Sequence, residues 1–238
     1  MTDPMETSVE SAHDRLPPWT SVLAVVAHPD DESFGLGGVL DAFARGGAAV
    51  DVLCLTHGEA STLHGVEGDL LAVRESELTA AADLLGVSHA WLRNHRDGAL
   101  GDLDPEILTG AVLDVARDAV PQGLLVFDTT GITGHPDHVA ASAAAVRASE
   151  ALDIPVLGWT VPASVAAQLN HELGSGFVGR PPEEIDLEVT VDRSRQLSAS
   201  RAHASQALPE SVLWRRLELL GDTESLRWLR GGAGPPAR

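Results

Sequence analysis

The sequence predicts an α/β fold in which a doubly wound, mostly parallel sheet is flanked by helices. Apolar runs typical of buried strands alternate with helical patterns from residue 21 onward. Such alternation favours parallel strand pairing through right-handed crossovers. No internal repeat or interior Pro/Gly-rich linker divides the 238 residues, and an apolar content of 44% is enough for one substantial core.

The first elements follow from continuous apolar runs and glycine stops. Residues 22–27 are all apolar, as expected for a strand buried on both faces. A helical pattern over 39–45 stops at Gly46, and a second strand is predicted over 49–55. A long amphipathic helix is predicted over 70–85, where Gly86 ends it.

The middle of the chain repeats this alternation. A third strand is predicted over 88–92. Asp104 as cap and Pro105 at the first helical position predict a helix over 105–119. The remaining predictions are a fourth strand over 123–127, a helix over 139–150 and a fifth strand over 155–159.

The last third is less regular. A helix is predicted over 162–173, a half-exposed strand over 185–191, and two closing helices over 194–207 and 209–220. We therefore expect a Rossmann-like sheet of strand order 3-2-1-4-5 with a small C-terminal extension. Residues 1–20 are predicted to form a flexible arm, 21–230 a single domain, and 231–238 a disordered tail.

Composition narrows the classes of function. A net charge of −19 repels phosphate backbones and argues against a nucleic-acid partner. The absence of lysine excludes Schiff-base chemistry and a P-loop lysine. The lone Cys54 lies in an apolar run and is predicted to be a buried spectator. No membrane span or signal peptide is predicted, so we expect a cytoplasmic protein; a homo-oligomer stays possible.

One imidazole and three carboxylates follow the first strand directly, at His28 and Asp30-Asp31-Glu32. Ligands of an open parallel sheet bind at the carboxyl ends of its strands. Carboxylates packed there repel one another, and a cation resolves that conflict. A divalent metal takes an imidazole and a carboxylate and leaves a neighbouring carboxylate free as a base. The alternative is a helix N-terminus, with an aspartate as cap and Glu32 in the first turn.

A second polar cluster, His135-Pro136-Asp137-His138, follows the fourth strand. The predicted strand order makes strands one and four neighbours, so both clusters converge on the crevice at the topological switch point. The alternative is that this segment only begins the next helix. A dinucleotide site at the glycines of 35–38 is rejected, because the adjacent carboxylates repel a pyrophosphate. These glycines instead let a helix approach the sheet closely.

These residues resemble a known family. Ala-His-Pro-Asp-Asp-Glu at 27–32 and Gly-His-Pro-Asp-His at 134–138 resemble motifs of the LmbE-like (PIG-L) N-deacetylases. Leu-Thr-His-Gly-Glu at 55–59, Arg-Glu-Ser-Glu at 74–77 and His-Ala-Ser-Gln at 203–206 resemble further family segments. The resemblance spans about residues 23–206.

The resemblance implies a zinc-dependent hydrolase that removes an acetyl group from the amine of an N-acetylglucosamine-type conjugate. Ferrous iron suits the same ligands. The implied metal ligands are His28, Asp31 and His138. Asp30 would be the general base, His135 would stabilise the oxyanion or protonate the leaving amine, and Asp137 would orient His135. Arg74 and Asp97 would hold the sugar. For Arg74, pairing with Glu75 or Glu77 on its own helix is an equal alternative.

One departure concerns the substrate. The resembling mycothiol-pathway deacetylases carry a tyrosine where this chain has Thr133, and the chain has no tyrosine at all. An amidase acting on a larger amide, such as a thiol conjugate or glycoside, therefore remains an alternative.

A catalytically idle metal- or sugar-binding protein is a further alternative, although a binding module has no need of the spare carboxylate Asp30. Of the other histidines, His57 and His64 are interpreted as solvated loop residues. His203 is placed near the pocket, in a structural or a catalytic role.

Overall fold

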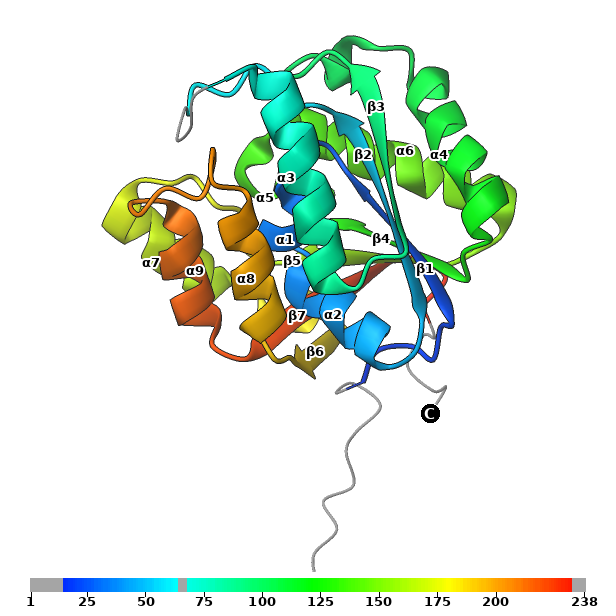
Figure 1. Cartoon of the computed structure of the whole chain (residues 1–238). Coiled ribbons are helices and arrows are strands. Elements are labelled where there is room, and N and C mark those ends of the chain that lie inside the picture. Colours follow the sequence, from blue (N-terminus) through cyan, green and yellow to red (C-terminus); the bar gives the residue numbers. More distant parts are fainter. Residues whose placement is uncertain (1–14, 64–67, 233–238) are drawn as a thin grey trace, which may run out of the picture.

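The structure, a computed structural model, describes residues 15–63 and 68–232. Its centre is a seven-stranded sheet of order β3-β2-β1-β4-β5-β7-β6 (Figure 1). The strands are β1 (Ser21–Val26), β2 (Ala49–Thr56), β3 (His89–His95), β4 (Gly123–Phe127), β5 (Val156–Thr160), β6 (Leu187–Thr190) and β7 (Thr223–Arg230). The first five pair in parallel, which confirms the predicted order, while β7 and β6 extend the sheet with antiparallel pairing.

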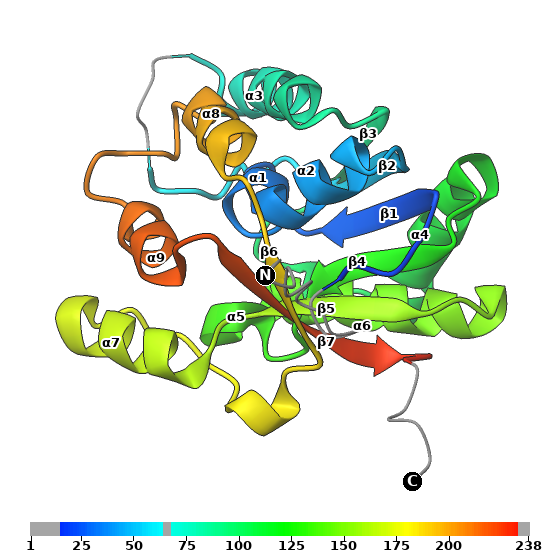
Figure 2. The same cartoon turned by 90° about the horizontal axis from the view of Figure 1, so that it is seen from below.

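Helices cover both faces of the sheet (Figure 2). The helical elements are α1 (Asp31–Phe34), α2 (Gly37–Arg45), α3 (Leu70–Leu85), η2 (Leu100–Asp102), α4 (Pro105–Ala119), α5 (Gly131–Gly134), α6 (Pro136–Leu152), α7 (Ala163–Leu173), η3 (Pro182–Glu184), α8 (Ser194–Ala202) and α9 (Val212–Leu220). Two apolar clusters fill the layers between them. One joins the sheet to α2, α3 and α8, and the other joins it to α4 and α6.

Local signals set several of these boundaries. The side chain of Asp69 caps α3, and Gly86 ends that helix with a φ of 76°. Asp104 caps α4, with Pro105 at its first position. The glycines before α2 permit close packing, as predicted, since a Cβ at Gly35 would overlap the ring of Phe127. Cys54 is buried, also as predicted.

The secondary structure predicted for the last third of the chain was wrong or incomplete. Helix α8 ends at Ala202 rather than at residue 207, because the next residues leave the helix to make buried contacts with α1 and α3. No strand was predicted over β7, whose partners β5 and β6 are distant in sequence. The predicted arm and tail lie partly outside the described residues. Within the arm, the ring of Trp19 stacks on Phe43.

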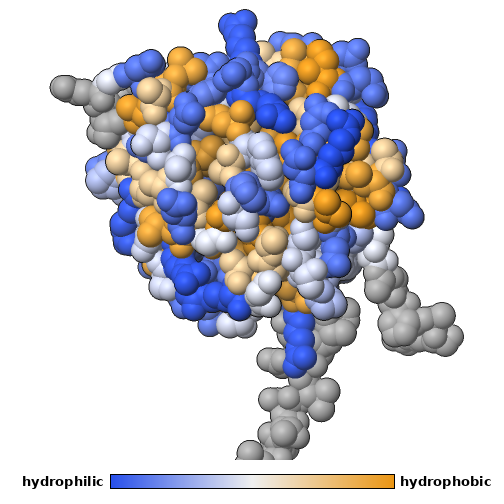
Figure 3. All heavy atoms as spheres, turned by 45° about the vertical axis from the view of Figure 1, so that its right-hand side comes forward, coloured by the Kyte–Doolittle hydropathy of each residue, from blue (hydrophilic) through white to orange (hydrophobic). Residues whose placement is uncertain are grey.

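In the described residues, no helix is both long and apolar enough to cross a membrane. Figure 3 shows a face on which apolar patches are mixed with polar side chains.

Asp128, at the end of β4, connects the sheet to the C-terminal elements. Its fully buried carboxylate accepts hydrogen bonds from Arg180 at 2.8 and 3.2 Å and from Arg227 at 3.4 Å. Burial raises the pKa of Asp128, but Arg180 and Thr130 together outweigh that effect and hold the pKa below its usual value.

We expect Asp128→Ala to lower the free energy of unfolding by about 3 kcal/mol at neutral pH, since it leaves two arginines without their buried partner. The difference should shrink as the pH falls through the carboxyl range, because a depressed pKa stabilises only the ionised form. Urea unfolding measures both effects. Arg117→Ala removes the exposed pair with Asp114 and should cost less than about 1 kcal/mol. Equal losses in the two variants would contradict the assignment.

Candidate metal centre and active site

Both polar clusters meet at the carboxyl ends of β1 and β4, as the strand order predicted. They line a pocket of about 340 Å³. Its walls are His28, Asp30, Asp31, Ala60, Ser61, Arg74, Asp97, Gly98, His135, His138 and Gln206. The segment after β1 also begins helix α1, with Asp30 at the N-cap and Glu32 in the first turn. The segment therefore begins a helix and also presents potential metal donors, so the two interpretations are compatible.

The potential metal-donor atoms of three side chains lie close together. The donor atoms of His28, Asp31 and His138 all lie within 4.8 Å of each other. Nε2 of His138 is 3.1 Å from Asp31 Oδ1, and Nδ1 of His28 is 3.5 Å from Asp31 Oδ2. Two imidazoles and one carboxylate with room for a further ligand suit a catalytic divalent metal.

In both His28 and His138, the other ring nitrogen already has an oxygen partner. Nε2 of His28 lies 3.0 Å from Asp97 and 3.4 Å from Asp137, and Nδ1 of His138 lies 3.2 Å from the carbonyl oxygen of Gly131. Metal-binding histidines usually donate their other N–H to such an oxygen, which fixes the ring and its tautomer. The residues present therefore fit a metal.

The electrostatics of the cluster also favour a bound cation. Burial lowers the pKa of His28, but hydrogen bonds with Asp137, Asp31 and Asp97 outweigh it and raise the pKa to about 12. Burial likewise opposes ionisation of Asp31, yet His138 and His28 hold the pKa of that carboxyl well below its usual value. The cluster thus attracts positive charge strongly, as a cation site must.

Asp31 is fixed by the backbone as well. Its Oδ2 accepts the N–H groups of His28 at 2.9 Å and Ala27 at 3.1 Å. These bonds hold one carboxylate oxygen and leave Oδ1 facing His138.

Asp30, the predicted base, lies beside this set and does not belong to it. Its carboxylate accepts a hydrogen bond from Nη2 of Arg74 at 2.8 Å. Burial raises the pKa of Asp30 to about 6, against the opposing effect of Arg74. A carboxylate with a pKa near neutrality is suited to general-base work.

Arg74 does not pair with its helix neighbours. Its guanidinium donates to the carbonyl oxygens of Gly58 and Pro29 in addition to Asp30, and the side chain is buried. Gly58 has a φ of 64°, and a Cβ there would overlap the guanidinium. Arg74 lines the pocket, so contact with a substrate is compatible with its place, but its observed partners hold the loops around Asp30.

Asp97 also lines the pocket and has a structural partner. Its Oδ1 faces His28, and its Oδ2 accepts the N–H of Ala60 at 2.8 Å. The residue predicted to hold the sugar thus also orients a candidate metal ligand.

His135 faces the same pocket. Its Nδ1 accepts the backbone N–H of Asp137 at 3.3 Å, so the neutral ring carries its proton on Nε2. Burial, together with His138 and His28, lowers the pKa of His135. A neutral ring with a free Nε2–H can donate a hydrogen bond to a developing oxyanion.

The contacts of Asp137 differ from the predicted ones. Its carboxylate was expected to orient His135, but it lies against Nε2 of His28 and accepts the N–H groups of Gly98 at 2.8 Å and Leu100 at 3.0 Å. Asp137 lies in the first turn of α6, and there its carboxylate reaches the two backbone N–H groups that follow β3 and the ring of His28.

Sequence reasoning missed several surrounding residues. Ser61 and Gln206 line the pocket and are joined by a 2.7 Å hydrogen bond.

The remaining histidines differ from one another in burial. His57 is buried against Asn94 at 2.6 Å, so its interpretation as a solvated histidine was wrong. His203, expected near the pocket in a structural or a catalytic role, is fully buried beside Glu32 and does not line the pocket. His64 lies outside the described residues, and Thr133 is exposed. The histidine of the His-Ala-Ser-Gln segment was the signal that could have indicated a buried pair.

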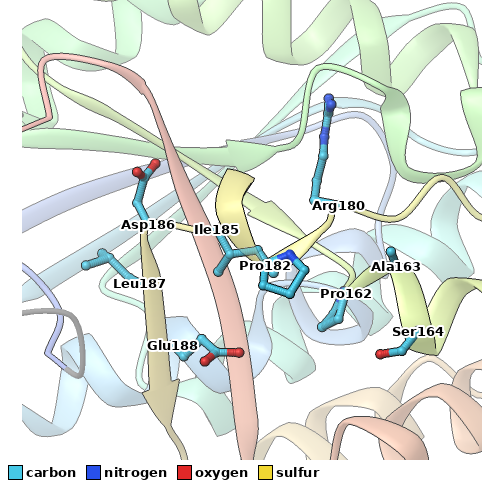
Figure 4. A pocket seen from close by; sticks show the side chains of 9 residues that line it. All are labelled: Pro162, Ala163, Ser164, Arg180, Pro182, Ile185, Asp186, Leu187 and Glu188. Atoms are coloured by element: carbon cyan, nitrogen blue, oxygen red, sulfur yellow. The ribbon is translucent and has the colours of Figure 1, made fainter.

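Two other pockets contain no comparable group of metal donors among the described residues. One, of about 330 Å³, lies between the start of α7 and β6 (Figure 4). Arg180 points away from the other labelled side chains there, and its guanidinium is bound to Asp128 and Glu184. The other, of about 350 Å³, is an apolar groove between α4 and α6. Among the described residues, both groups of potential metal donors contain His28 and lie at the carboxyl ends of β1, β3 and β4.

Known proteins are similar to this chain in sequence. Residues 23–149, more than half of the chain, match the family of GlcNAc-PI de-N-acetylases (PIG-L). A probable N-acetyl-α-D-glucosaminyl L-malate deacetylase 2 of Bacillus anthracis is 30% identical over 213 residues, which cover 87% of this chain and 91% of that protein. A 1D-myo-inositol 2-acetamido-2-deoxy-α-D-glucopyranoside deacetylase of Rhodococcus opacus is 30% identical over 236 residues, with coverages of 78% and 81%.

A solved structure has the same fold. The antimicrobial reagent A40926 pseudoaglycone deacetylase Dbv21 superposes with a TM-score of 0.68 at 22% identity, covering 90% of this chain and 99% of that one. At that identity the likeness concerns the fold alone. The family match and the extended relatives show that the chain belongs to the PIG-L (LmbE-like) family of de-N-acetylases.

Proposed function

We propose that this protein is a metal-dependent hydrolase that removes the acetyl group from an N-acetylglucosamine-type conjugate. One observation carries the proposal. The pocket combines a His28/Asp31/His138 donor set with a carboxylate and an imidazole, Asp30 and His135, that stay outside that set. A pure binding site needs the donor set alone. The deacetylase names of the extended relatives support the same reaction.

The ligands in this proposal are His28, Asp31 and His138. A divalent metal held by these three residues would supply Lewis acidity, which makes water a stronger acid and polarises a carbonyl group. We assign zinc, while ferrous iron suits the same donors. A competition between the two metals on the same preparation decides the assignment.

The chain's own residues perform the proton transfers. Asp30 accepts the proton of the attacking water, and Arg74 keeps that carboxylate oriented. His135 donates a hydrogen bond from Nε2 to the oxygen that gains negative charge. The proton that Asp30 has taken from the water then passes to the leaving amine. Asp97 and Asp137 hold the ring of His28.

The substrate is proposed from chemistry and from relatives. Arg74, Asp97, Ser61 and Gln206 give the pocket polar walls that suit a hydroxyl-rich sugar. The two extended relatives are named for deacetylation of glucosaminyl malate and glucosaminyl inositol compounds. Mycothiol-pathway relatives are expected to have a tyrosine where this chain has Thr133. The substrate is therefore best identified by testing a panel of different N-acetylglucosamine conjugates.

Asp30→Asn should retain metal and lose about 10²- to 10⁴-fold in kcat, because an amide cannot accept the water's proton. Asparagine tolerates the positive φ of this position better than most residues do. Acetate release and metal content by mass spectrometry measure the two effects. Unchanged turnover in a metal-replete variant would refute the role of Asp30.

Asp137→Asn should weaken metal affinity by about 10- to 100-fold, because His28 loses a carboxylate that orients it. Competition with a chromophoric chelator measures the affinity. Asp102→Asn, an exposed change in η2, is the matched control. Equal affinities in all three proteins would contradict the role of Asp137 behind His28.

Removal of the metal by a chelator should abolish turnover and lower the melting temperature, since binding to the folded state alone stabilises it by mass action. Stoichiometric zinc or ferrous iron should restore both. Turnover that survives in protein shown to be free of metal would exclude the proposed mechanism, whereas a metal-replete protein inactive on every amide of the panel would favour a binding function.

A further inference from the structure

Glu32 and His203 form a buried pair directly behind the candidate active site. Both side chains are fully buried, and Nε2 of His203 lies 2.6 Å from Glu32 Oε1. They are far apart in sequence, at the start of α1 and just after the end of α8. Neither lines the pocket. The pair is therefore outside the groups that touch a metal or substrate.

The second oxygen of Glu32 acts on the candidate base. Oε2 accepts the backbone N–H of Asp30 at 2.9 Å. Asp30 has a φ of 113° and a ψ of −31°, a backbone conformation that side-chain-bearing residues rarely adopt. Such a conformation persists only where surrounding contacts determine it. The hydrogen bond from Glu32 is one of those contacts.

A second contact acts on the other end of the same residue. The carboxylate of Asp30 is bound by Arg74 of α3. Asp30 is thus held by its N–H and by its carboxylate, and the two restraints together aim the carboxylate into the pocket.

The segment that follows α8 contacts the helices that provide both of these restraints. His203 holds Glu32, and two residues later the N–H and hydroxyl of Ser205 donate to Glu77 at 2.8 and 2.6 Å. Glu77 lies one turn after Arg74 on α3. In Figures 1 and 2, α8 lies beside α1 and α3, which agrees with these bonds. One short segment therefore fixes the helices that carry both partners of Asp30.

We propose that His203 is a positioning residue for the proposed general base. Its imidazole N–H holds Glu32, and Glu32 in turn holds the backbone of Asp30 in the conformation that directs its carboxylate into the pocket. The catalytic consequence rests on the proposed deacetylase function, while the backbone consequence does not. A buried pair that only stabilises the fold is the competing explanation, and the two differ in what they do to Asp30.

The test compares His203→Gln with His203→Leu in the full-length protein. A glutamine amide N–H can occupy the place of the imidazole Nε2–H, whereas leucine offers no donor. Arg193→Leu is the matched control, because it breaks another buried ion pair of the same helix region, with Glu224, without a contact to Glu32 or Asp30. Hydrogen exchange of the Asp30 amide by NMR, melting temperature, metal content, kcat and KM are measured for each.

In His203→Leu we expect the Asp30 amide to exchange at least about tenfold faster. With metal content and KM unchanged, kcat should fall by about 10- to 100-fold, as a misplaced base produces. His203→Gln should recover most of both quantities. Arg193→Leu should lower the melting temperature and leave the Asp30 amide and kcat as they are.

The proposal is overturned if the Asp30 amide stays protected in folded His203→Leu, or if the glutamine variant regains stability without regaining kcat. Should the leucine variant not fold, the same comparison is made with His203→Asn, whose shorter amide falls short of Glu32. A native protein that cleaves no amide would refute the proposed function, and the exchange of the Asp30 amide would still decide the role of His203.

Discussion

The crowding of carboxylates at the carboxyl ends of β1 and β4 is the constraint on which the surrounding structure depends. Asp30, Asp31, Asp97 and Asp137 lie around one small pocket with a single arginine, Arg74. Two like charges about 4 Å apart repel by about 4 kcal/mol under ordinary protein screening, several times the value of an exposed ion pair. Each carboxylate is therefore matched to a backbone N–H, a histidine or Arg74, and the donor set remains as a site for a cation.

The same residues begin helices and form the site, and these two roles support each other. His28 and Asp31 follow β1 at once. After β4, the short helix α5 leads to His135, which is the N-cap of α6, and His138 lies in the first turn of α6. A helix start brings consecutive polar side chains and free N–H groups to one point. Asp31 and Asp137 are held by backbone N–H groups of the neighbouring segments, Ala27 and His28 for Asp31 and Gly98 and Leu100 for Asp137. Both carboxylates lie against the ring of His28.

The C-terminal third completes a site that the N-terminal two thirds begin. Gln206 supplies part of the pocket wall, Ser205 holds α3, and His203 holds α1. Arg193, Glu224 and Trp159 form a further buried polar group that ties α8 to β5 and β7. Buried polar groups persist where they are paired, because an unpaired one costs the full free energy of its desolvation. The segment 203–206 is thus part of the site's support, whereas the group around Arg193 stabilises the packing of α8 on the sheet.

The sequence by itself determined the parallel order β3-β2-β1-β4-β5 and the meeting of the polar segments 28–32 and 135–138, because both follow from local patterns and from a topological rule. The choice of His28, Asp31 and His138 within these segments came from the resemblance to the LmbE-like family. Alternating strands and helices, two polar strand ends and well-marked caps are all readable within short windows of sequence. The separation of Asp30 from the metal donors was a prediction that its pairing with Arg74 supports.

Only the tertiary structure decided which carboxylate faces which histidine. Asp137 lies against His28 rather than His135, Arg74 binds Asp30 rather than a neighbour on its own helix, and His203 reaches Glu32. The same holds for β7, whose place in the sheet depends on partners far away in the chain. Local pattern cannot specify these contacts, because each joins segments tens of residues apart, and the outcome depends on which buried polar groups find partners when the whole chain packs.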